Sequence, residues 1–220
     1  MTFAFGVAMS TQAFAADPMS LSTHDWSGTY AGIQLGYGGG PAVTNELNWP
    51  SGTLNDGPLD YDASGLVAGV HVGHNLQSGS FVYGAEADLE YSAISGFWDW
   101  NNGNTVNKDI QWTGSLRARA GFAMDRVLVY GTAGMAFASV KMETVNGGAA
   151  DVLSGTETTL GWTAGVGAEY AIDNAWSTRV EYRYADYGDT QVAGSIFGGP
   201  YAYPHDNKVH AVRIGISRKF

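Results

Sequence analysis

The 220-residue sequence contains no cysteine, which excludes disulfide bonds and thiolate sites. Charge is also scarce, since only 15% of the residues are charged and 11 Lys and Arg stand against 21 Asp and Glu. The net charge of -10 argues against nucleic-acid binding, because no basic stripe is present to neutralise phosphates. Nor is there a continuous apolar run of about 18 residues, so no membrane-spanning helix is predicted.

The sequence is instead rich in glycine and aromatic residues, with 31 Gly, seven Trp, twelve Tyr and nine Phe. This composition favours strands with close backbone approaches and amphipathic aromatic side chains. The N-terminal apolar run ends in Ala13-Phe14-Ala15, the small-x-small form of an export cleavage site. Residues 1–15 are therefore predicted to be a signal peptide, and residues 16–220 a single domain. A short apolar helix of the mature protein is the alternative for the first segment.

Apolar and polar residues alternate along the chain with the period of a two-faced strand. In the last segment Val212, Ile214 and Ile216 lie on one face and Arg213 on the other. The segment 127–140 is apolar at both sets of positions, so its facing is not assigned. Eight strands are expected near residues 29–38, 65–76, 81–91, 110–122, 127–140, 159–170, 176–184 and 210–220.

The predicted connections alternate strictly between short and long. The short ones are residues 77–80, 124–126 and 172–174, and the long ones are 39–62, 93–109, 142–156 and 188–207. Strands of roughly ten residues joined in this way are typical of an all-β, eight-stranded antiparallel up-and-down transmembrane β-barrel with tight periplasmic turns and long outer loops. A soluble β-sandwich also alternates in facing, but its crossings have no reason to alternate in length. The predicted location is the cell outer membrane.

Five acidic residues and five arginines lie within the predicted strands, opposite the aromatic and branched residues. Inside a narrow barrel such charges must pair, because an isolated buried charge costs several kcal/mol. We therefore expect an ion-paired lumen with no open channel. The ten residues are Glu86, Asp88, Glu90, Arg117, Arg119, Glu169, Arg179, Glu181, Arg183 and Arg213.

Aromatic residues near the strand ends are expected to form two girdles at the membrane interfaces. The candidates are Trp26, Tyr37, Tyr83, Tyr91, Trp112, Phe122, Tyr130, Trp162, Tyr170, Trp176, Tyr182, Tyr184 and Phe220.

Four stretches carry a resemblance to a known family: "WSGTYAGIQLGYGGG" (26–40), "GWTAGVGAEYAI" (161–172), "RVEYRYADYG" (179–188) and "VRIGISRKF" (212–220). The chain resembles the small alphaproteobacterial outer-membrane β-barrel surface antigens, related to the opacity-protein and OmpA transmembrane-domain type. The resemblance implies that the barrel assembly machinery reads the last strand, whose matching residues are Val212, Ile214, Ile216 and Phe220. Arg218 departs from the aromatic or apolar residue common at its position.

Some members of that family are described as porin-like or haemin-binding. The resemblance therefore draws attention to Tyr201, Tyr203 and His205, which lie in the last long connection and are the types of residue that ligate haem iron. A packed surface loop with the same residues is the simpler interpretation.

We expect a structural surface protein that supports envelope integrity and contacts outer-membrane lipid, lipopolysaccharide and host or environmental partners. The alternatives are a low-conductance porin-like channel, a haemin-binding surface protein and a soluble periplasmic binder. An enzyme is not expected, because no G-x-S-x-G motif occurs and the strand carboxylates, which could pair for acid–base work, are matched by an equal number of arginines that favour a structural network. No cofactor or metal site is expected: His71 and His74 are an odd number apart and face opposite ways, and the acidic connections lack a calcium-ligand spacing.

Overall fold

The computed structural model describes residues 24–48, 50–99, 103–146, 151–196 and 199–220. The predicted signal peptide, residues 1–15, lies outside the described residues. No helix in the described part of the chain is long and apolar enough to cross a membrane. The strands are β1 (Gly28–Asn48), β2 (Thr53–Ser78), β3 (Phe81–Asp99), β4 (Thr105–Met124), β5 (Val127–Asn146), β6 (Asp151–Ala171), β7 (Trp176–Ile196) and β8 (Gly199–Lys219).

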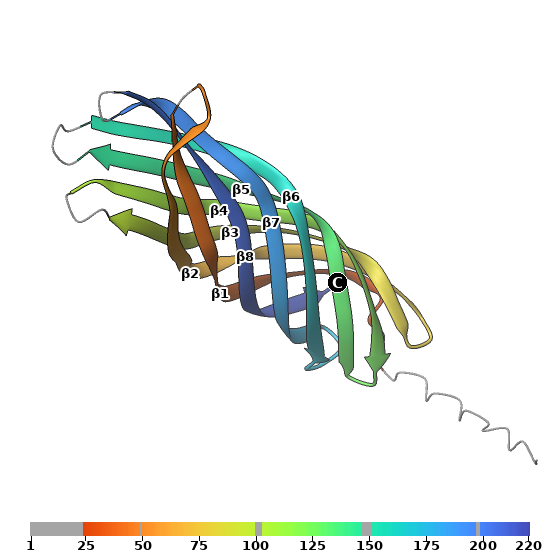
Figure 1. The fold of residues 1–220 in the computed structure, drawn as a ribbon. Coiled ribbons are helices and arrows are strands. Elements are labelled where there is room, and N and C mark those ends of the chain that lie inside the picture. Colours follow the sequence, from red (N-terminus) through yellow and green to blue (C-terminus); the bar gives the residue numbers. More distant parts are fainter. Residues whose placement is uncertain (1–23, 49, 100–102, 147–150, 197–198) are drawn as a thin grey trace, which may run out of the picture.

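The eight strands form one closed antiparallel barrel (Figure 1). Each strand pairs with its neighbours in sequence, and β8 returns to β1. Ile33 of β1 shows the closure, because it lies opposite Val70 of β2 on one side and Ile216 of β8 on the other. The predicted eight-stranded up-and-down fold is confirmed.

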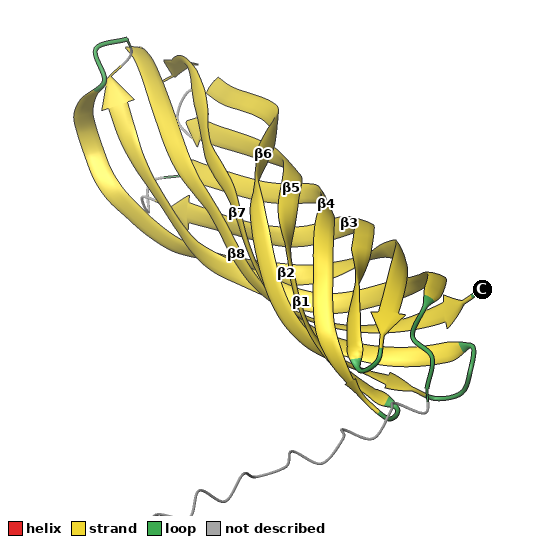
Figure 2. Ribbon diagram, turned by 90° about the vertical axis from the view of Figure 1, so that its right-hand side faces the viewer, coloured by secondary structure: helices red, strands yellow, loops and turns green. Residues whose placement is uncertain are grey.

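The strands are about twice as long as predicted, and the prediction of four long outer loops is wrong. Residues 39–62 do not form a loop: β1 and β2 stay paired from Gly39↔Ser64 to Asn48↔Thr53. The other three long connections likewise continue as paired strands, which project at one end of the barrel (Figure 2). The reason is composition: residues 39–62, for example, are rich in Gly, Asn, Asp and Pro, which is typical of loops and obscures the period of two.

Tight turns join the strands at the opposite end, where β1 begins and β8 ends; we call this the terminal end. Gly79 between β2 and β3 and Asp125 between β4 and β5 adopt left-handed φ values of 62° and 53°. The turn before β7 is held by the Asp173 carboxylate, whose Oδ1 accepts 2.7 Å hydrogen bonds from the backbone N–H groups of Ala175 and Trp176. The three short connections are thus as predicted.

Side chains alternate between the lumen and the outer surface, which also settles the facing of β5. Leu128, Tyr130 and Thr132 point into the barrel, whereas Val129 and Met135 are exposed outside. The outer surface carries an apolar band edged by aromatic residues. One edge consists of Tyr37, Tyr91, Trp112, Phe137, Trp162, Tyr182 and Tyr184, and the edge at the terminal end of Phe81, Tyr83, Phe122, Tyr170, Trp176 and Phe220.

Two residues assigned to these girdles lie inside the barrel instead. Trp26 and Tyr130 are only 4% and 3% exposed. Trp26 precedes β1 and closes the terminal end, and the Tyr130 hydroxyl donates a 3.1 Å hydrogen bond to Glu181 Oε2. In the lumen the Tyr130 hydroxyl can donate to a carboxylate, which explains why this aromatic side chain points inward.

The height of the apolar band matches a membrane. From Trp112 to Phe122 β4 advances ten residues. At about 3.4 Å per residue and a tilt of about 40°, this is roughly 26 Å along the barrel axis, close to the ~25 Å apolar band of outer-membrane barrels.

Candidate functional site

A belt of charged side chains fills the lumen at the depth of the apolar band. The pleat directs every second residue of five strands inward, so that carboxylates from β3 meet arginines from β4 and β7 across the barrel. None of the ten side chains is more than 8% exposed. This charged belt consists of Glu86, Asp88, Glu90, Arg117, Arg119, Glu169, Arg179, Glu181, Arg183 and Arg213, the ten residues selected from the sequence.

Glu86 lies at the centre of the belt. Its Oε1 is 2.5 Å from Arg117 Nη2, and its Oε2 is 2.5 Å from Arg179 Nη1 and 3.8 Å from Arg119 Nη1. Arg119 also pairs with Glu169 toward the terminal end. One carboxylate thus contacts guanidinium groups from two strands on opposite sides of the lumen.

The remaining pairs extend the belt toward the other end. Arg183 Nη1 is 3.1 Å from Asp88 Oδ1, and its Nη2 is 2.7 Å from Glu181 Oε1. Arg213 holds both oxygens of Glu90 at 2.8 Å in a bidentate pair. Five carboxylates and five guanidinium groups therefore compensate one another, which is the condition for burying charge without a large penalty.

Neutral residues complete the belt, and the sequence analysis did not select them. The Tyr30 hydroxyl donates to Glu86 Oε2 at 2.8 Å. Gln34 donates to Glu90 at 2.8 Å and accepts from Arg179 at 2.5 Å. The Arg119 guanidinium lies 3.8 Å from the centroid of the Tyr130 ring. Tyr30 and Gln34 lie at even-numbered positions of β1, which face the lumen. The alternation along this strand would therefore have identified them as lumen residues.

Apolar layers close the lumen on both sides of the charged belt. The layer at the terminal end consists of Trp26, Val82, Ala123, Leu128, Tyr130 and Ala171. The layer beyond the other side consists of Ala63, Val67, Ile94, Ile110, Ala136, Ala138, Val140, Met142, Ala185, Tyr187 and Val209.

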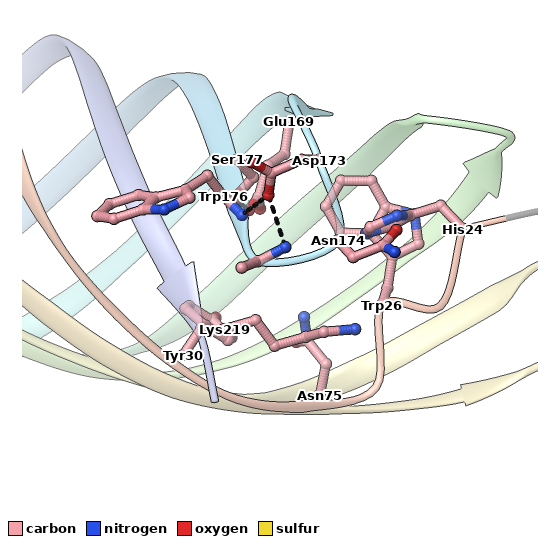
Figure 3. Close-up of a pocket in the computed structure, with 11 residues that line it drawn as sticks. His24, Trp26, Tyr30, Asn75, Glu169, Asp173, Asn174, Trp176, Ser177 and Lys219 are labelled. Atoms are coloured by element: carbon pink, nitrogen blue, oxygen red, sulfur yellow. Dashed lines mark hydrogen bonds between the residues drawn. The ribbon is translucent and has the colours of Figure 1, made fainter.

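A small pocket opens at the terminal end (Figure 3). The His24 and Trp26 rings meet edge to face with centroids 4.7 Å apart, and Lys219 reaches across toward Asp25. Burial lowers the pKa of His24, and the positive charge of Lys219 adds to this effect. Hydrogen bonds from the backbone of Ala175 and Trp176 hold the pKa of Asp173 below its usual value.

The charge is distributed very unevenly along the barrel axis. We call the described parts of residues 39–64, 92–110, 138–159 and 185–210 the distal section, which lies beyond the aromatic edge opposite the terminal end. It contains twelve Asp and Glu but only three Lys, whereas the charged belt is balanced. Nearly all of the net charge of -10 therefore lies in the distal section.

The residues considered for haemin binding lie in strand β8, not in a loop. Tyr201 pairs with Asn48, and His205 with Thr190. Tyr203 is 1% exposed and donates a 2.8 Å hydrogen bond to Glu46 Oε2. Burial, with a contribution from Glu46, raises the pKa of Tyr203, so its phenol stays protonated. A protonated, engaged phenol is a poor iron ligand.

The residues of the last strand that the resemblance assigns to assembly lie on the outer surface. Val212, Ile214 and Ile216 belong to the apolar band, and Phe220 is 76% exposed. The Phe220 backbone N–H donates to Thr29 O at 2.9 Å, which holds the chain end on β1. Arg218 lies on the same face, 5.8 Å and 5.6 Å from the ring centroids of Trp176 and Phe220.

The described residues contain no group of three or more His, Asp or Glu side chains that could hold a metal ion. His71 is buried, with Nε2 2.8 Å from Ser217 Oγ, whereas His74 lies on the exterior with Nδ1 2.9 Å from Thr29 Oγ1. Their opposite facing is as predicted.

Comparison with known proteins decides the family. The family model described as "Outer membrane protein beta-barrel domain" matches residues 1–220. The chain belongs to this family. It is 34% identical to the 31 kDa outer-membrane immunogenic protein of Brucella melitensis, over 97% of this chain and 93% of that protein. It is 36% identical to the 22 kDa outer membrane protein of Rhizobium leguminosarum, over 77% and 74% of the two chains.

Solved structures of outer-membrane barrels share the fold of this family member. The outer membrane protein OprG from Pseudomonas aeruginosa aligns with a TM-score of 0.56 and 13% identity, covering 88% of this chain and 96% of that one. The outer membrane protease OmpT from Escherichia coli aligns with a TM-score of 0.55 and 10% identity, covering 93% and 99%. At these identities the likeness concerns the fold alone. The family and its relatives locate the protein in the outer membrane, as predicted, and the apolar band is the part that lies in lipid.

Proposed function

We propose that the protein is a structural surface protein of the outer membrane whose lumen is closed. Its terminal end faces the periplasm, and its acidic distal section faces the outside. The observation that carries this proposal is the compensated charged belt between two apolar layers. The names of the relatives, which are outer-membrane immunogenic proteins, support exposure of this surface.

A porin-like channel is the alternative, and the geometry disfavours it. Conduction requires a continuous file of water, but the belt fills the cross-section at the middle of the membrane. Moving an ion through the belt would separate ion pairs such as Arg213 with Glu90, in which Nε and Nη2 of the arginine each lie 2.8 Å from a carboxylate oxygen. Separation of a buried pair costs several kcal/mol, so spontaneous opening is rare.

Single-channel recording separates the two functions. Purified protein in a planar lipid bilayer is expected to give no current steps above the lipid baseline. The variants Arg117→Ala and Glu181→Ala test the lumen directly, because a conducting lumen would change its step size when a lining charge is removed. Reproducible wild-type steps that shift in these variants would establish the channel and contradict the closed barrel.

A structural role is tested in the cell. Deletion of the gene is expected to increase sensitivity to detergent and leakage of periplasmic enzymes, and the wild-type gene to restore both. Slower uptake of small solutes with an intact barrier would instead support a diffusion channel.

The proposal includes contacts made by the outer surface. The aromatic edges suit lipid headgroups, and the exposed last strand suits recognition by the assembly machinery. Substitution of Phe220 by Ala is expected to reduce the amount of folded protein in the outer membrane, measured as the heat-modifiable band on SDS gels. The control is Phe97→Ala, an exposed aromatic of the distal section; an equal loss in both would contradict a specific signal.

No catalytic role is part of the proposal. The acidic residues that would be needed for acid–base chemistry in the lumen are each bonded to arginine, and such compensated carboxylates are poor proton donors and acceptors near neutral pH.

A further inference from the structure

The distal section is not a closed barrel. The ladder between β6 and β7 runs from Ala171↔Ser177 to Trp162↔Asp186 and has no further pair among the described residues, although β6 reaches back to Asp151 and β7 continues to Ile196. The described ladder between β2 and β3 likewise ends at Ser64↔Ser95. The distal section therefore consists of two four-stranded leaves, and the strand ends spread apart there (Figure 2).

A specific kink separates β7 from β6. The β7–β8 register shifts between Asp186 and Asp189, and Gly188 within this bulge has a φ of 73°. Its N–H donates to Asp186 Oδ1 at 3.1 Å, and its carbonyl accepts from Asn207 Nδ2 at 2.8 Å. Hydrogen bonds on both sides of Gly188 hold the bend, so the opening is part of the fold.

The backbone groups of β6 that face this opening can be assigned, and they begin before Leu160, whose carbonyl still lies beside Gly188 of β7. Ala171 N–H donates to Arg126 O beside β5, and Ile172 N–H donates to Trp176 O of β7. Donors alternate sides along a strand, and the β5–β6 ladder has no register shift. The even-numbered residues of β6 therefore direct N–H and C=O groups toward the opening. Those at the opening are Val152, Ser154, Thr156 and Thr158.

This edge has few of the usual protections against strand addition. Natural edge strands are blunted by charged side chains, especially Lys, and by Pro, bulges or covering segments. Residues 151–161, "DVLSGTETTLG", contain neither Lys, Arg nor Pro, and three Thr favour an extended backbone. We call this segment, residues 151–161, the β6 edge.

The charged residues around the β6 edge determine which kind of polypeptide segment can pair with it. Asp151 and Glu157 lie on the edge itself, and the facing part of β7, residues 187–196, contains no Lys or Arg. Lys141, across from Thr156 on β5, is neutralised by Glu143 at 3.4 Å. A second copy of this chain would bring the same acidic segment, and like charges on paired strands destabilise the pairing.

We propose that the β6 edge binds an extended, cationic polypeptide segment as an added strand. The backbone of the four even-numbered residues supplies the hydrogen bonds, and the acidic residues select Lys- or Arg-bearing partners. This surface role goes beyond the proposed structural function and does not depend on a closed lumen, so conductance and peptide binding fail independently.

The test uses purified full-length protein folded in detergent micelles and a decapeptide of alternating Lys and Thr. The peptide is expected to slow amide hydrogen exchange at Ser154, Thr156 and Thr158. The variant Thr156→Pro/Thr158→Pro removes two donors that face the opening, where proline is tolerated at an edge. Its affinity for the peptide is expected to fall at least tenfold, whereas Thr156→Ala/Thr158→Ala, which keeps both N–H groups, retains binding.

Heat-modifiable mobility shows that both variants are folded before binding is measured. Equal binding by the proline and alanine variants, without exchange protection, would reduce the effect to charge adsorption and overturn the proposal. Equal binding of an alternating Glu and Thr decapeptide would overturn the cationic preference. Protection that arises without peptide as protein concentration rises would replace the partner with a second copy.

Discussion

The charged belt and the distal section are built from the same strands but treat charge in opposite ways. In the belt five carboxylates face five guanidinium groups, and every one of these side chains is buried. In the distal section twelve carboxylates stand against three lysines. Water explains the difference: charge removed from water must be compensated by a partner, whereas exposed charge is solvated and screened.

The two regions also differ in how completely their strands are paired by backbone hydrogen bonds. At membrane depth all eight ladders are complete, because lipid cannot hydrogen-bond to an open strand edge. Beyond the aromatic edge the β6–β7 and β2–β3 ladders end, because water there satisfies unpaired backbone groups. Membrane depth thus demands pairing of both charge and backbone, whereas the water-exposed parts of the distal section are free of both demands.

Removal of one belt arginine is expected to have the largest effect on stability, and it tests whether buried charge in the belt must be compensated. Arg117 contacts Glu86, Asp88 and Glu181. Arg117→Ala removes a guanidinium group that three buried carboxylates share, which leaves one negative charge of the belt uncompensated, and it is expected to lower the free energy of unfolding by about 3–5 kcal/mol. Urea unfolding of the protein in lipid vesicles measures the loss.

The matched control is Lys141→Ala in the distal section. The side chains of Lys141 and its partner Glu143 are 40% and 35% exposed, and such a pair contributes only about 0–1 kcal/mol. If the two substitutions had similar effects, burial would not distinguish the two regions.

Alternation allowed the fold and the facing of the charged residues to be predicted, because lipid on one side and a polar lumen on the other enforce a period of two. The facing of β5 could not be predicted, since its inward residues lie mainly in the apolar layers, as with Leu128 and Val140. Strand length could not be predicted because segments such as 39–62 are rich in Gly, Asn, Asp and Pro, although inward residues such as Val106 and Tyr203 are buried beyond the aromatic edge. The individual ion pairs depend on register and on contacts across the lumen, such as Glu86 with Arg179, which no local pattern encodes.

The distal section also contains a buried carboxylate with a hydrogen-bond partner, as the charged belt does, and this contact tests burial separately from location. The Tyr203 hydroxyl donates to Glu46, which is 7% exposed. Tyr203→Phe removes this donor and is expected to cost about 1–3 kcal/mol, with faster amide exchange in the β1–β2 hairpin. Tyr201→Phe, at a half-buried neighbour, is the control. No change in exchange would show that water replaces the hydroxyl.

Salt is expected to act on the distal section and not on the belt. Excess negative charge repels itself at low ionic strength, and raising the salt from about 0.01 M to about 0.15 M shortens the screening length from about 30 Å to about 8 Å. Stability should rise modestly over this range. The variant Asp60→Asn/Asp62→Asn, which removes two exposed carboxylates, should reduce that rise, whereas a larger rise in the variant would contradict repulsion as its cause.

The smallest expected effect lies in the turn before β7, which tests an exposed carboxylate held by the backbone. Two backbone N–H groups bind the ionised Asp173, so its folded-state pKa lies below the unfolded value. The resulting stabilisation is fully present above the unfolded pKa and is lost as the pH falls through the folded pKa. Exchange of the Ala175 and Trp176 amides in Asp173→Ala should therefore exceed that of the wild type at neutral pH, and the difference should vanish in acid. Asn174→Ala, in the same turn but without a carboxylate, should show no such pH dependence, and a matching dependence there would assign the effect to the turn as a whole.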